Sequence, residues 1–183
     1  MSYIGGRKIE LERLIEQARQ AEAFVSLIDP DHRDFVAPAD VVQAVSAFCR
    51  RTGQRQPDSP AEVARCIFES LALACARTLE RLRRNTGRRI EVLHIVGGGA
   101  RNRLLCQLTA DACGLTVVAG PAEATALGNI LVQALGRGLL SSVEQLRQVC
   151  RASVELKRYE PHETERWQEQ LERFSRLAAS AGD

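Results

Sequence analysis

The stretch from Ile90 to Gly114 limits the fold of this chain more than any other part of the sequence. It begins with a short apolar run typical of a buried strand and continues as an amphipathic helical pattern that Gly114 closes. Between the run and the helix lie three consecutive glycines, Gly97, Gly98 and Gly99. The change of apolar period across so short a connection predicts a strand, a tight turn and a helix, in that order.

The glycine turn has the chemistry of a ligand site. Glycines permit positive φ angles and leave no Cβ in the way of a ligand. The free N–H groups at the helix start favour polar or anionic groups, and the amide of Asn102 adds a donor and an acceptor. These features suit a nucleotide, although a tight strand–helix connection without any ligand would carry the same pattern. The turn is not a G-x-G-x-x-G motif and no Walker lysine follows, so neither a Rossmann nor a P-loop site is indicated. Because alanine has a high helix propensity, we expect Asn102→Ala to leave the following helix intact.

The apolar pattern divides the chain into three segments. Residues 1–88 are mainly helical, residues 89–160 alternate strand and helix, and residues 161–183 form a C-terminal helix. One helix separates the two predicted strands, 90–96 and 115–119, which predicts a parallel pair with a right-handed crossover. The predicted fold class is therefore α/β, rich in helix, with a small parallel sheet. Because two strands make a thin sheet, either further strands precede this chain or another chain covers the exposed sheet edge by self-association.

Two helix starts follow from local signals. Pro38 suits the first turn of a helix that follows a polar loop. Ser59-Pro60-Ala61-Glu62 forms a capping box with proline at the first helical position, and the helix that it opens is predicted to run to about Gly87. The predicted buried stripe of this long helix consists of Val63, Ile67, Leu71, Cys75 and Leu79.

Composition excludes several classes of partner. The 183 residues carry a net charge of +2, and the basic run from Arg81 to Arg89 lacks interleaved aromatic side chains. We therefore interpret this run as a solvated helix end and not as a nucleic-acid interface. The sequence contains no apolar stretch long enough to span a membrane and does not open with a signal peptide. A cytoplasmic protein that binds neither nucleic acid nor membrane is expected.

The six cysteines show neither a C-x-x-C pair nor the spacing of a zinc site, so no metal site is predicted. Cys49 and Cys66 lie on different predicted helices joined by a short connection, and they are the candidate pair for a disulfide. Buried reduced thiols are nevertheless the usual state in a cytosolic protein. Asp111 lies near the C-terminal end of its helix, where the helix dipole disfavours a negative charge, so we expect a tertiary partner to compensate.

Four stretches of the sequence resemble one protein family. They are HIVGGGARNRLLCQLTADACGLTVVAGPAEATALGN, IDPDHRDFVAPADVV, FCRRTGQRQPDSPAEVARCIFESLAL and ALGRGLLSSVEQLRQVCRASVELKRYEP, which together cover about residues 24 to 162. The first stretch resembles the second lobe of the FGGY carbohydrate kinases. The other three resemble a narrower branch of that family, whose members phosphorylate L-rhamnulose. Two departures from this branch, ACAR after ESLAL and Ala100-Arg101 in the turn, leave the glycines and Asn102 unchanged.

The resemblance implies a fold of two lobes and a different function for each lobe. Kinases of this family have two actin-like, ribonuclease H-like lobes, with ATP and sugar in the cleft between them. On this basis the chain is the C-terminal part of the second lobe, Gly98 and Asn102 contact the adenine side of ATP, and Gly97 and Gly99 shape the turn. Magnesium would be bound mainly through the nucleotide. The family's D-x-G-T phosphate motif and catalytic aspartate belong to the N-terminal lobe, and neither is found in this sequence.

The resemblance therefore predicts part of an ATP-dependent sugar kinase that binds ATP or ADP and has no catalytic residue of its own. The sugar would be bound only together with the N-terminal lobe, and the isolated chain is expected to lack kinase activity. Two alternatives remain open. One is a kinase of the same family for another sugar, such as xylulose or gluconate. The other is a non-catalytic module that binds nucleotide or self-associates.

Overall fold

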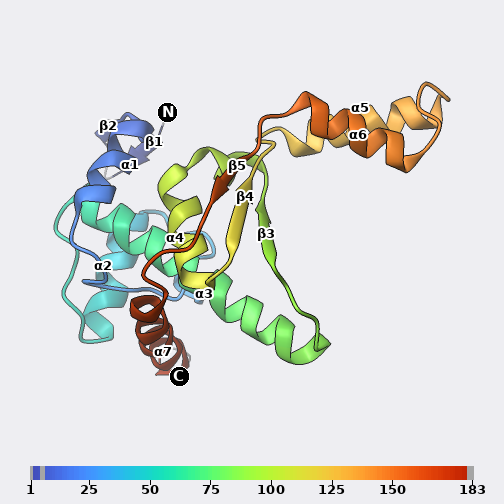
Figure 1. The fold of residues 1–183 in the computed structure, drawn as a ribbon. Coiled ribbons are helices and arrows are strands. Elements are labelled where there is room, and N and C mark those ends of the chain that lie inside the picture. Colours follow the sequence, from blue (N-terminus) through green and yellow to red (C-terminus); the bar gives the residue numbers. More distant parts are fainter. Residues whose placement is uncertain (1, 5–6, 181–183) are drawn as a thin grey trace.

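Helix α3 (Pro60–Thr86) is the longest element among the described residues, and helices α1, α4 and α7 pack against it (Figure 1). The computed structural model describes residues 2–4 and 7–180. The other elements are β1 (Ser2–Ile4), β2 (Arg7–Ile9), α1 (Leu11–Gln20), the 3-10 helix η1 (Arg33–Phe35), α2 (Val41–Arg51), β3 (Val92–Ile95), the 3-10 helix η2 (Gly97–Arg101), α4 (Arg103–Cys113), β4 (Thr116–Ala119), α5 (Ala124–Gly136), α6 (Val143–Ser153), β5 (Lys157–Tyr159) and α7 (Thr164–Ser180).

The ends of α3 follow the predicted signals. The Ser59 hydroxyl accepts a hydrogen bond from the Glu62 N–H at 3.2 Å, and Pro60 occupies the first helical position. The Glu62 carboxylate accepts from the N–H of Asp58 at 2.9 Å, one residue earlier than a standard capping box. Gly87 closes the helix in a left-handed conformation at φ +62°. The capped start and glycine stop are therefore confirmed.

The predicted start of α2 is wrong by about one turn. Pro38 lies in the loop, and the helix begins at Val41 after Asp40. The Asp40 carboxylate accepts hydrogen bonds from the N–H groups of Val42 at 2.8 Å and Gln43 at 3.2 Å. A carboxylate that satisfies two free N–H groups fixes the helix start more strongly than the fixed φ of a proline.

The predicted buried stripe of α3 is only partly correct. Val63 and Leu79 are buried, whereas Leu71 is 38% exposed. A stripe drawn in steps of four residues advances by about 400° per step and therefore drifts off one face of a helix of 3.6 residues per turn. The face that is buried consists of Val63, Ala64, Cys66, Glu69, Ser70, Ala72, Leu73, Ala76 and Leu79.

The main core lies between α3 and the three helices that cover it. Its buried apolar residues include Leu14 and Ala18 from α1, Leu73, Ala76 and Leu79 from α3, Leu104 and Leu108 from α4, and Trp167, Leu171 and Phe174 from α7. Two smaller clusters accompany it. One joins α2 to the first turns of α3, and the other joins α4 to the sheet.

The sheet that carries the glycine turn has three strands in the order β3-β4-β5. Strands β3 and β4 are parallel, with Val92 opposite Thr116 and Ile95 opposite Ala119, as predicted from the single intervening helix. Strand β5 pairs antiparallel with β4, so the expectation of a wholly parallel sheet is wrong. The chain leaves the end of β4 into α5 and α6 and returns to that same end, which forces β5 to run in the opposite direction (Figure 1).

Helices α5 and α6 form an arm that projects from the body of the molecule (Figure 1). The two helices pack on each other, and residues 124–153 contribute nothing to the three core clusters. Helix α5 contains no charged side chain, and its one buried residue is Leu131. Ile130 is 65% exposed and Val132 is 62% exposed. Within the arm, helix α5 therefore presents an uncharged surface with exposed apolar side chains to solvent.

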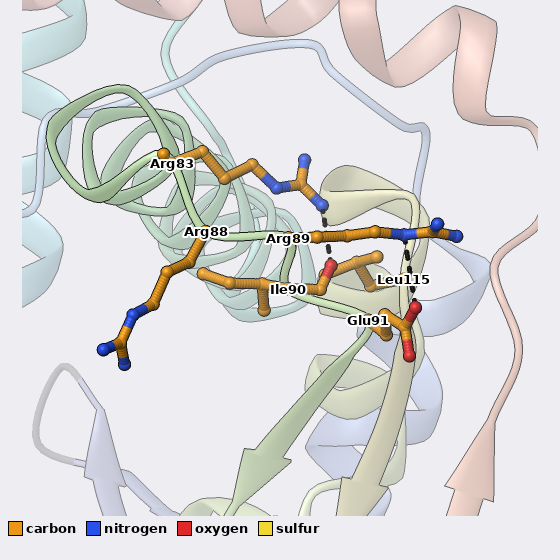
Figure 2. A pocket seen from close by; sticks show the side chains of 7 residues that line it. Arg83, Arg88, Arg89, Ile90, Glu91 and Leu115 are labelled. Carbon is orange, nitrogen blue, oxygen red and sulfur yellow. Dashed lines mark hydrogen bonds and ion pairs between the residues drawn. The ribbon is translucent and has the colours of Figure 1, made fainter.

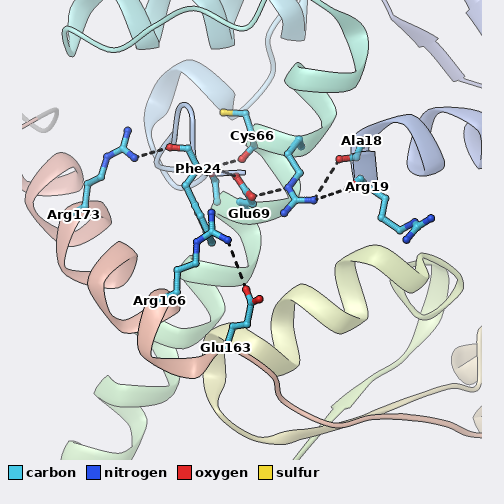
Figure 3. A network of polar contacts seen from close by, with 10 residues as sticks. Ala18, Arg19, Phe24, Cys66, Glu69, Glu163, Arg166 and Arg173 are labelled. Atoms are coloured by element: carbon cyan, nitrogen blue, oxygen red, sulfur yellow. Dashed lines mark hydrogen bonds and ion pairs between the residues drawn. The ribbon is translucent and has the colours of Figure 1, made fainter. Parts of the chain in front are cut away.

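A buried carboxylate ties three parts of the body together (Figure 3). The Glu69 side chain is 1% exposed and accepts hydrogen bonds from the Phe24 N–H at 2.9 Å and from Arg65 Nε at 2.6 Å. The Arg65 guanidinium also donates to the carbonyls of Ala18 at 3.4 Å and Arg19 at 3.3 Å. The pair thereby links α3 to the C-terminal end of α1 and to the segment that follows it.

We expect Glu69→Ala to lower the free energy of unfolding by about 3 kcal/mol, because it leaves the largely buried Arg65 guanidinium without its counter-charge. Glu16→Ala is the matched control, since Glu16 forms an ion pair with Arg19 on the exposed face of α1 and should change stability little. Urea unfolding followed by circular dichroism measures both variants. An equal decrease in the free energy of unfolding of both variants would show that burial adds nothing to the contribution of the Glu69–Arg65 pair.

Glu69 also predicts a pH dependence of stability. Burial raises the pKa of its carboxyl above the ordinary value of 4.5, so the folded state holds this proton more tightly than the unfolded state. The free energy of unfolding should therefore fall as pH rises from 4.5 through the raised pKa and then level off. Glu69→Gln, which does not titrate, should abolish this part of the pH profile. An unchanged profile in that variant would assign the dependence to another group.

Candidate nucleotide site at the glycine turn

The turn after β3 is held in place by the connection that follows β4. Gly97 has φ +73°, a conformation that favours glycine, and its N–H donates to the Pro121 carbonyl at 3.0 Å. The Gly120 N–H donates in return to the Ile95 carbonyl at 2.8 Å. A short 3-10 helix, Gly97–Arg101, separates the strand from α4. Two backbone bonds thus fix the position of the turn relative to the neighbouring strand.

The three glycines have different surroundings. A Cβ on Gly99 would lie 3.5 Å from Ile95 Cγ2, in contact with the sheet, and Gly97 requires its positive φ. A Cβ on Gly98 would meet nothing within 4 Å, and Gly98 is exposed. Gly97 therefore satisfies a demand of the fold, whereas a Cβ on Gly99 would make an ordinary van der Waals contact and a Cβ on Gly98 would meet open space. The predicted contact of Gly98 with a nucleotide stays a prediction, and the open space beside it suits that role.

Asn102 is the N-cap of α4. Its side-chain oxygen accepts a hydrogen bond from the Leu105 N–H at 3.0 Å. That Asn102→Ala leaves the helix intact stays a prediction, but the reason for it omitted the cap, which the substitution removes at a cost in stability. The cap uses the acceptor of the amide, so any hydrogen bond to a nucleotide would come from the amino group.

A cavity lined by charged side chains lies on one side of the turn. Its volume is about 720 Å³, it lies between α1 and the start of α4, and its charged lining consists of Glu12, Glu16, Arg19, Arg101, Arg103 and Lys157. Arg19 pairs with Glu16, and Arg101 pairs with Glu123 at the start of α5. The lining therefore carries both signs of charge, with an excess of positive side chains that would favour an anionic ligand.

The basic run at the other end of β3 belongs to a separate pocket (Figure 2). Its volume is about 590 Å³, and Arg83 and Arg89 help to line it. Arg83 donates to the Ile90 carbonyl at 3.3 Å, and Arg89 pairs with Glu91 at 3.2 Å. These contacts close the α3–β3 turn, so part of the run serves the fold.

Asp111 has the tertiary partners that its place on α4 requires. Its carboxylate accepts hydrogen bonds from the side chain of Gln107 at 2.8 Å and from the N–H of His162 at 2.8 Å. Burial raises the pKa of Asp111. The bond to His162 connects α4 to the segment before α7, so Asp111 has a structural role, as expected.

Cys49 and Cys66 lie together, as the sequence suggested. They are 0% and 3% exposed, belong to the same buried cluster, and are both free cysteines. That they form a disulfide stays a prediction. Sequence reasoning did not find a second thiol pair, Cys75 with Cys113, because these residues are far apart in the chain and only the packing of α3 on α4 brings them together.

Two features are absent from the described part of the chain. Among residues 2–4 and 7–180, no group of three or more His, Cys, Asp or Glu side chains is arranged to hold a metal ion. Within the same residues, no helix combines the length and apolar character needed to cross a bilayer.

Comparison with known proteins agrees with this geometry. Residues 6–136 match the C-terminal domain of the FGGY family of carbohydrate kinases. The chain is 49% identical over 154 residues to a rhamnulokinase of Bacteroides thetaiotaomicron, covering 84% of this chain and 32% of the relative. It is 45% identical over 153 residues to a rhamnulokinase of an Enterobacter species, covering 84% of this chain and 31% of the relative. The chain thus spans about a third of the length of these relatives.

The fold has a counterpart among solved structures. The crystal structure of xylulose kinase from Rhodospirillum rubrum superposes with a TM-score of 0.61 at 19% identity, over 93% of this chain and 34% of that one. At this identity the likeness shows the fold alone. The chain belongs to the FGGY family of carbohydrate kinases, and what it contains is the C-terminal domain of that family.

The cap predicts different effects on stability for two substitutions at position 102. Asn102→Ala should lower the free energy of unfolding by about 1 kcal/mol, because Leu105 loses its acceptor. Asn102→Asp should leave stability nearly unchanged, since aspartate caps as well as asparagine does. Asn85→Ala, at an exposed position near the end of α3, is the control. Urea unfolding of the three variants provides the measurement, and full stability in Asn102→Ala would show that the cap is dispensable.

Proposed function

We propose that this chain is the C-terminal part of the second lobe of an ATP-dependent rhamnulokinase, which converts L-rhamnulose and ATP to L-rhamnulose 1-phosphate and ADP. Similarity to two rhamnulokinases at 49% and 45% identity supports this substrate over other sugars of the family. The observation that carries the nucleotide role is the glycine turn, where Gly98 is exposed and open beside the amide of Asn102.

The role of the chain would be to hold the adenosine side of ATP. Gly98 would allow the nucleoside to approach the backbone, and the amino group of Asn102 would donate to it while the oxygen keeps its bond to Leu105. Gly97 and Gly99 would hold the turn in shape. This arrangement binds and orients, and such positioning is a large part of phosphoryl transfer catalysis.

The rest of the reaction would depend on the other lobe. A base for the sugar hydroxyl and groups that hold the γ-phosphate are needed for transfer, and the described residues offer neither a D-x-G-T motif nor a metal-binding cluster. Magnesium would then reach the site with the nucleotide phosphates and neutralise their charge. The sugar would bind in the cleft between this lobe and the other, in a cytoplasmic enzyme that needs neither membrane nor nucleic acid.

A non-catalytic module is the second candidate, and one observation favours it. Strand β3 is an edge of the sheet, and the apolar surface of α5 is exposed close by in the fold (Figure 1). Exposed edges and apolar surfaces of this kind support self-association. Sedimentation of the chain over a range of concentrations would detect such assembly.

The kinase proposal is tested with a protein that joins this chain to the upstream lobe of its own reading frame. Release of ADP, coupled to a spectroscopic assay, should require L-rhamnulose and Mg-ATP and should be weaker with xylulose or gluconate. The 183-residue chain alone should show no turnover. Preference for xylulose or gluconate would move the chain to another branch of the family. Nucleotide binding without turnover on any of the three sugars would favour the non-catalytic module.

The nucleotide contact is tested by Gly98→Val in the same protein. A branched side chain there meets open space in the fold but would enter the volume assigned to the nucleoside. We expect stability to be unchanged and ATP affinity to fall by at least about tenfold, or 1.4 kcal/mol, by calorimetry. Gly136→Val, in the exposed last position of α5, is the control and should keep ATP affinity. Equal ATP affinity in the two variants would show that the turn does not contact the nucleotide and has a structural role alone.

A further inference from the structure

Helices α3 and α4 bring into contact two cysteines that are far apart in the sequence. Cys75 lies in the second half of α3, and Cys113 is the last residue of α4. Cys113 belongs to the main core, and Cys75 packs against it. Cys113 also lines a small cavity together with Ala76, the residue after Cys75, and Leu79, one helical turn further along α3. Both cysteines are free thiols, and each shifts the pKa of the other. The two side chains therefore lie close together where α4 packs on α3.

The Cys75–Cys113 pair has one partly exposed member, whereas both members of the Cys49–Cys66 pair are buried. Cys75 is partly exposed, and a cavity of about 90 Å³ borders Cys113. Since a water molecule occupies about 30 Å³ in the liquid, this cavity has room for a small oxidant. By contrast, Cys49 and Cys66 are both buried in the cluster between α2 and α3.

We propose that Cys75 and Cys113 form a redox site that a hydroperoxide oxidises to an intramolecular disulfide between α3 and α4, ahead of the Cys49–Cys66 pair. The proposal stands on the packing of the two side chains at the α3–α4 contact, the partial exposure of Cys75 and the cavity beside Cys113. Nothing in the proposed kinase reaction uses either residue, so the site is independent of that function.

The charge state of the pair supports a defined order of steps. The hydrogen bond from Cys113 lowers the pKa of the Cys75 thiol to about 7, so a large fraction is thiolate at neutral pH. The pKa of Cys113 is raised, first by the same hydrogen bond and then by burial, so Cys113 keeps its proton. Cys75 is therefore the sulfur that attacks an oxidant, and Cys113 is the resolving thiol.

The chemistry balances with one hydroperoxide. The Cys75 thiolate attacks the outer peroxide oxygen, the O–O bond breaks, and a sulfenic acid forms while hydroxide (or alkoxide) leaves. The Cys113 sulfur then attacks the Cys75 sulfur, the S–O bond breaks, and hydroxide leaves with the Cys113 proton as water. The first leaving group takes a proton from solvent. The two sulfurs together lose two electrons, and the peroxide is reduced.

The test uses the folded 183-residue chain and stoichiometric hydrogen peroxide. After reaction, remaining thiols are blocked with N-ethylmaleimide in denaturant, and the cross-linked peptides are identified by tandem mass spectrometry. Cys66 and Cys75 share one tryptic peptide, so a second, glutamate-specific protease that cleaves at Glu69 is needed to separate them. We expect free thiols to fall from six to four, with Cys75 joined to Cys113 and a higher Tm that dithiothreitol reverses.

Two alanine variants make the result specific. In Cys113→Ala the cross-link should be absent. Cys75 should then form a sulfenic acid that dimedone traps, but more slowly than wild type loses free thiols, because the group that lowers the pKa of Cys75 is gone. In the matched control Cys49→Ala, which removes one thiol of the other pair, the Cys75–Cys113 cross-link should form as before. Cross-linking of Cys49 to Cys66 first, or full alkylation of Cys75 and Cys113 in oxidised wild type, would overturn the proposal. The disulfide-linked peptides identified in the oxidised wild-type protein test the proposal even if Cys113→Ala does not fold.

Discussion

The packing of α4 against α3 is the contact on which the rest of the structure depends. Alanines on α3, Ala72 and Ala76, allow the two helices to approach closely, and Leu104 and Leu108 of α4 fill the space between them. Strands β3 and β4 flank α4 in the chain, so the position of α4 also sets the position of the sheet. The glycine turn lies at the start of α4 and inherits its place from the same contact. The candidate site is thus an outcome of helix packing at a distance from it.

The groups at the glycine turn itself are suited to holding a ligand. They are backbone N–H donors and one amide, with the cations of the neighbouring cavity close by and the carboxylates of Glu12 and Glu16 among the other groups that line that cavity. The titratable groups whose pKa is raised by burial, such as Glu69 and Asp111, are occupied by hydrogen bonds that connect helices. Burial therefore acts on carboxyl groups that hold the fold together.

Local signals were enough to predict the parts of the fold that local interactions decide. The cap at Ser59, the stop at Gly87 and the strand–turn–helix order around Gly97 each depend on a few neighbouring residues. The parallel pairing of β3 with β4 followed from the single helix between them. At the site, the distinct surroundings of Gly98 could not be predicted, because they depend on what is absent around it in space.

Two of the errors share a physical cause, which is that one residue favours a structure or role that a competing local interaction overrides. Asp40 outweighed Pro38 because two hydrogen bonds are stronger than a fixed φ. Asn102 was considered for its ligand chemistry alone, although a side chain of that type before a helix is also a cap. The direction of β5 depends on where the arm returns the chain, and the meeting of Cys75 with Cys113 depends on how two helices pack. Neither has a signature in nearby residues.

The bonds between the glycine turn and residues 120–121 have a mechanical consequence. These residues are the root of the arm, so the turn and the arm share one anchored hinge. Helix α5 has 13 residues and a length of about 20 Å. On a lever of that length, a rotation of about 5° at the root displaces the far end by roughly 2 Å. A rotation too small to change the contacts at the turn would therefore still move the tip of the arm by a distance comparable to a bond length or more.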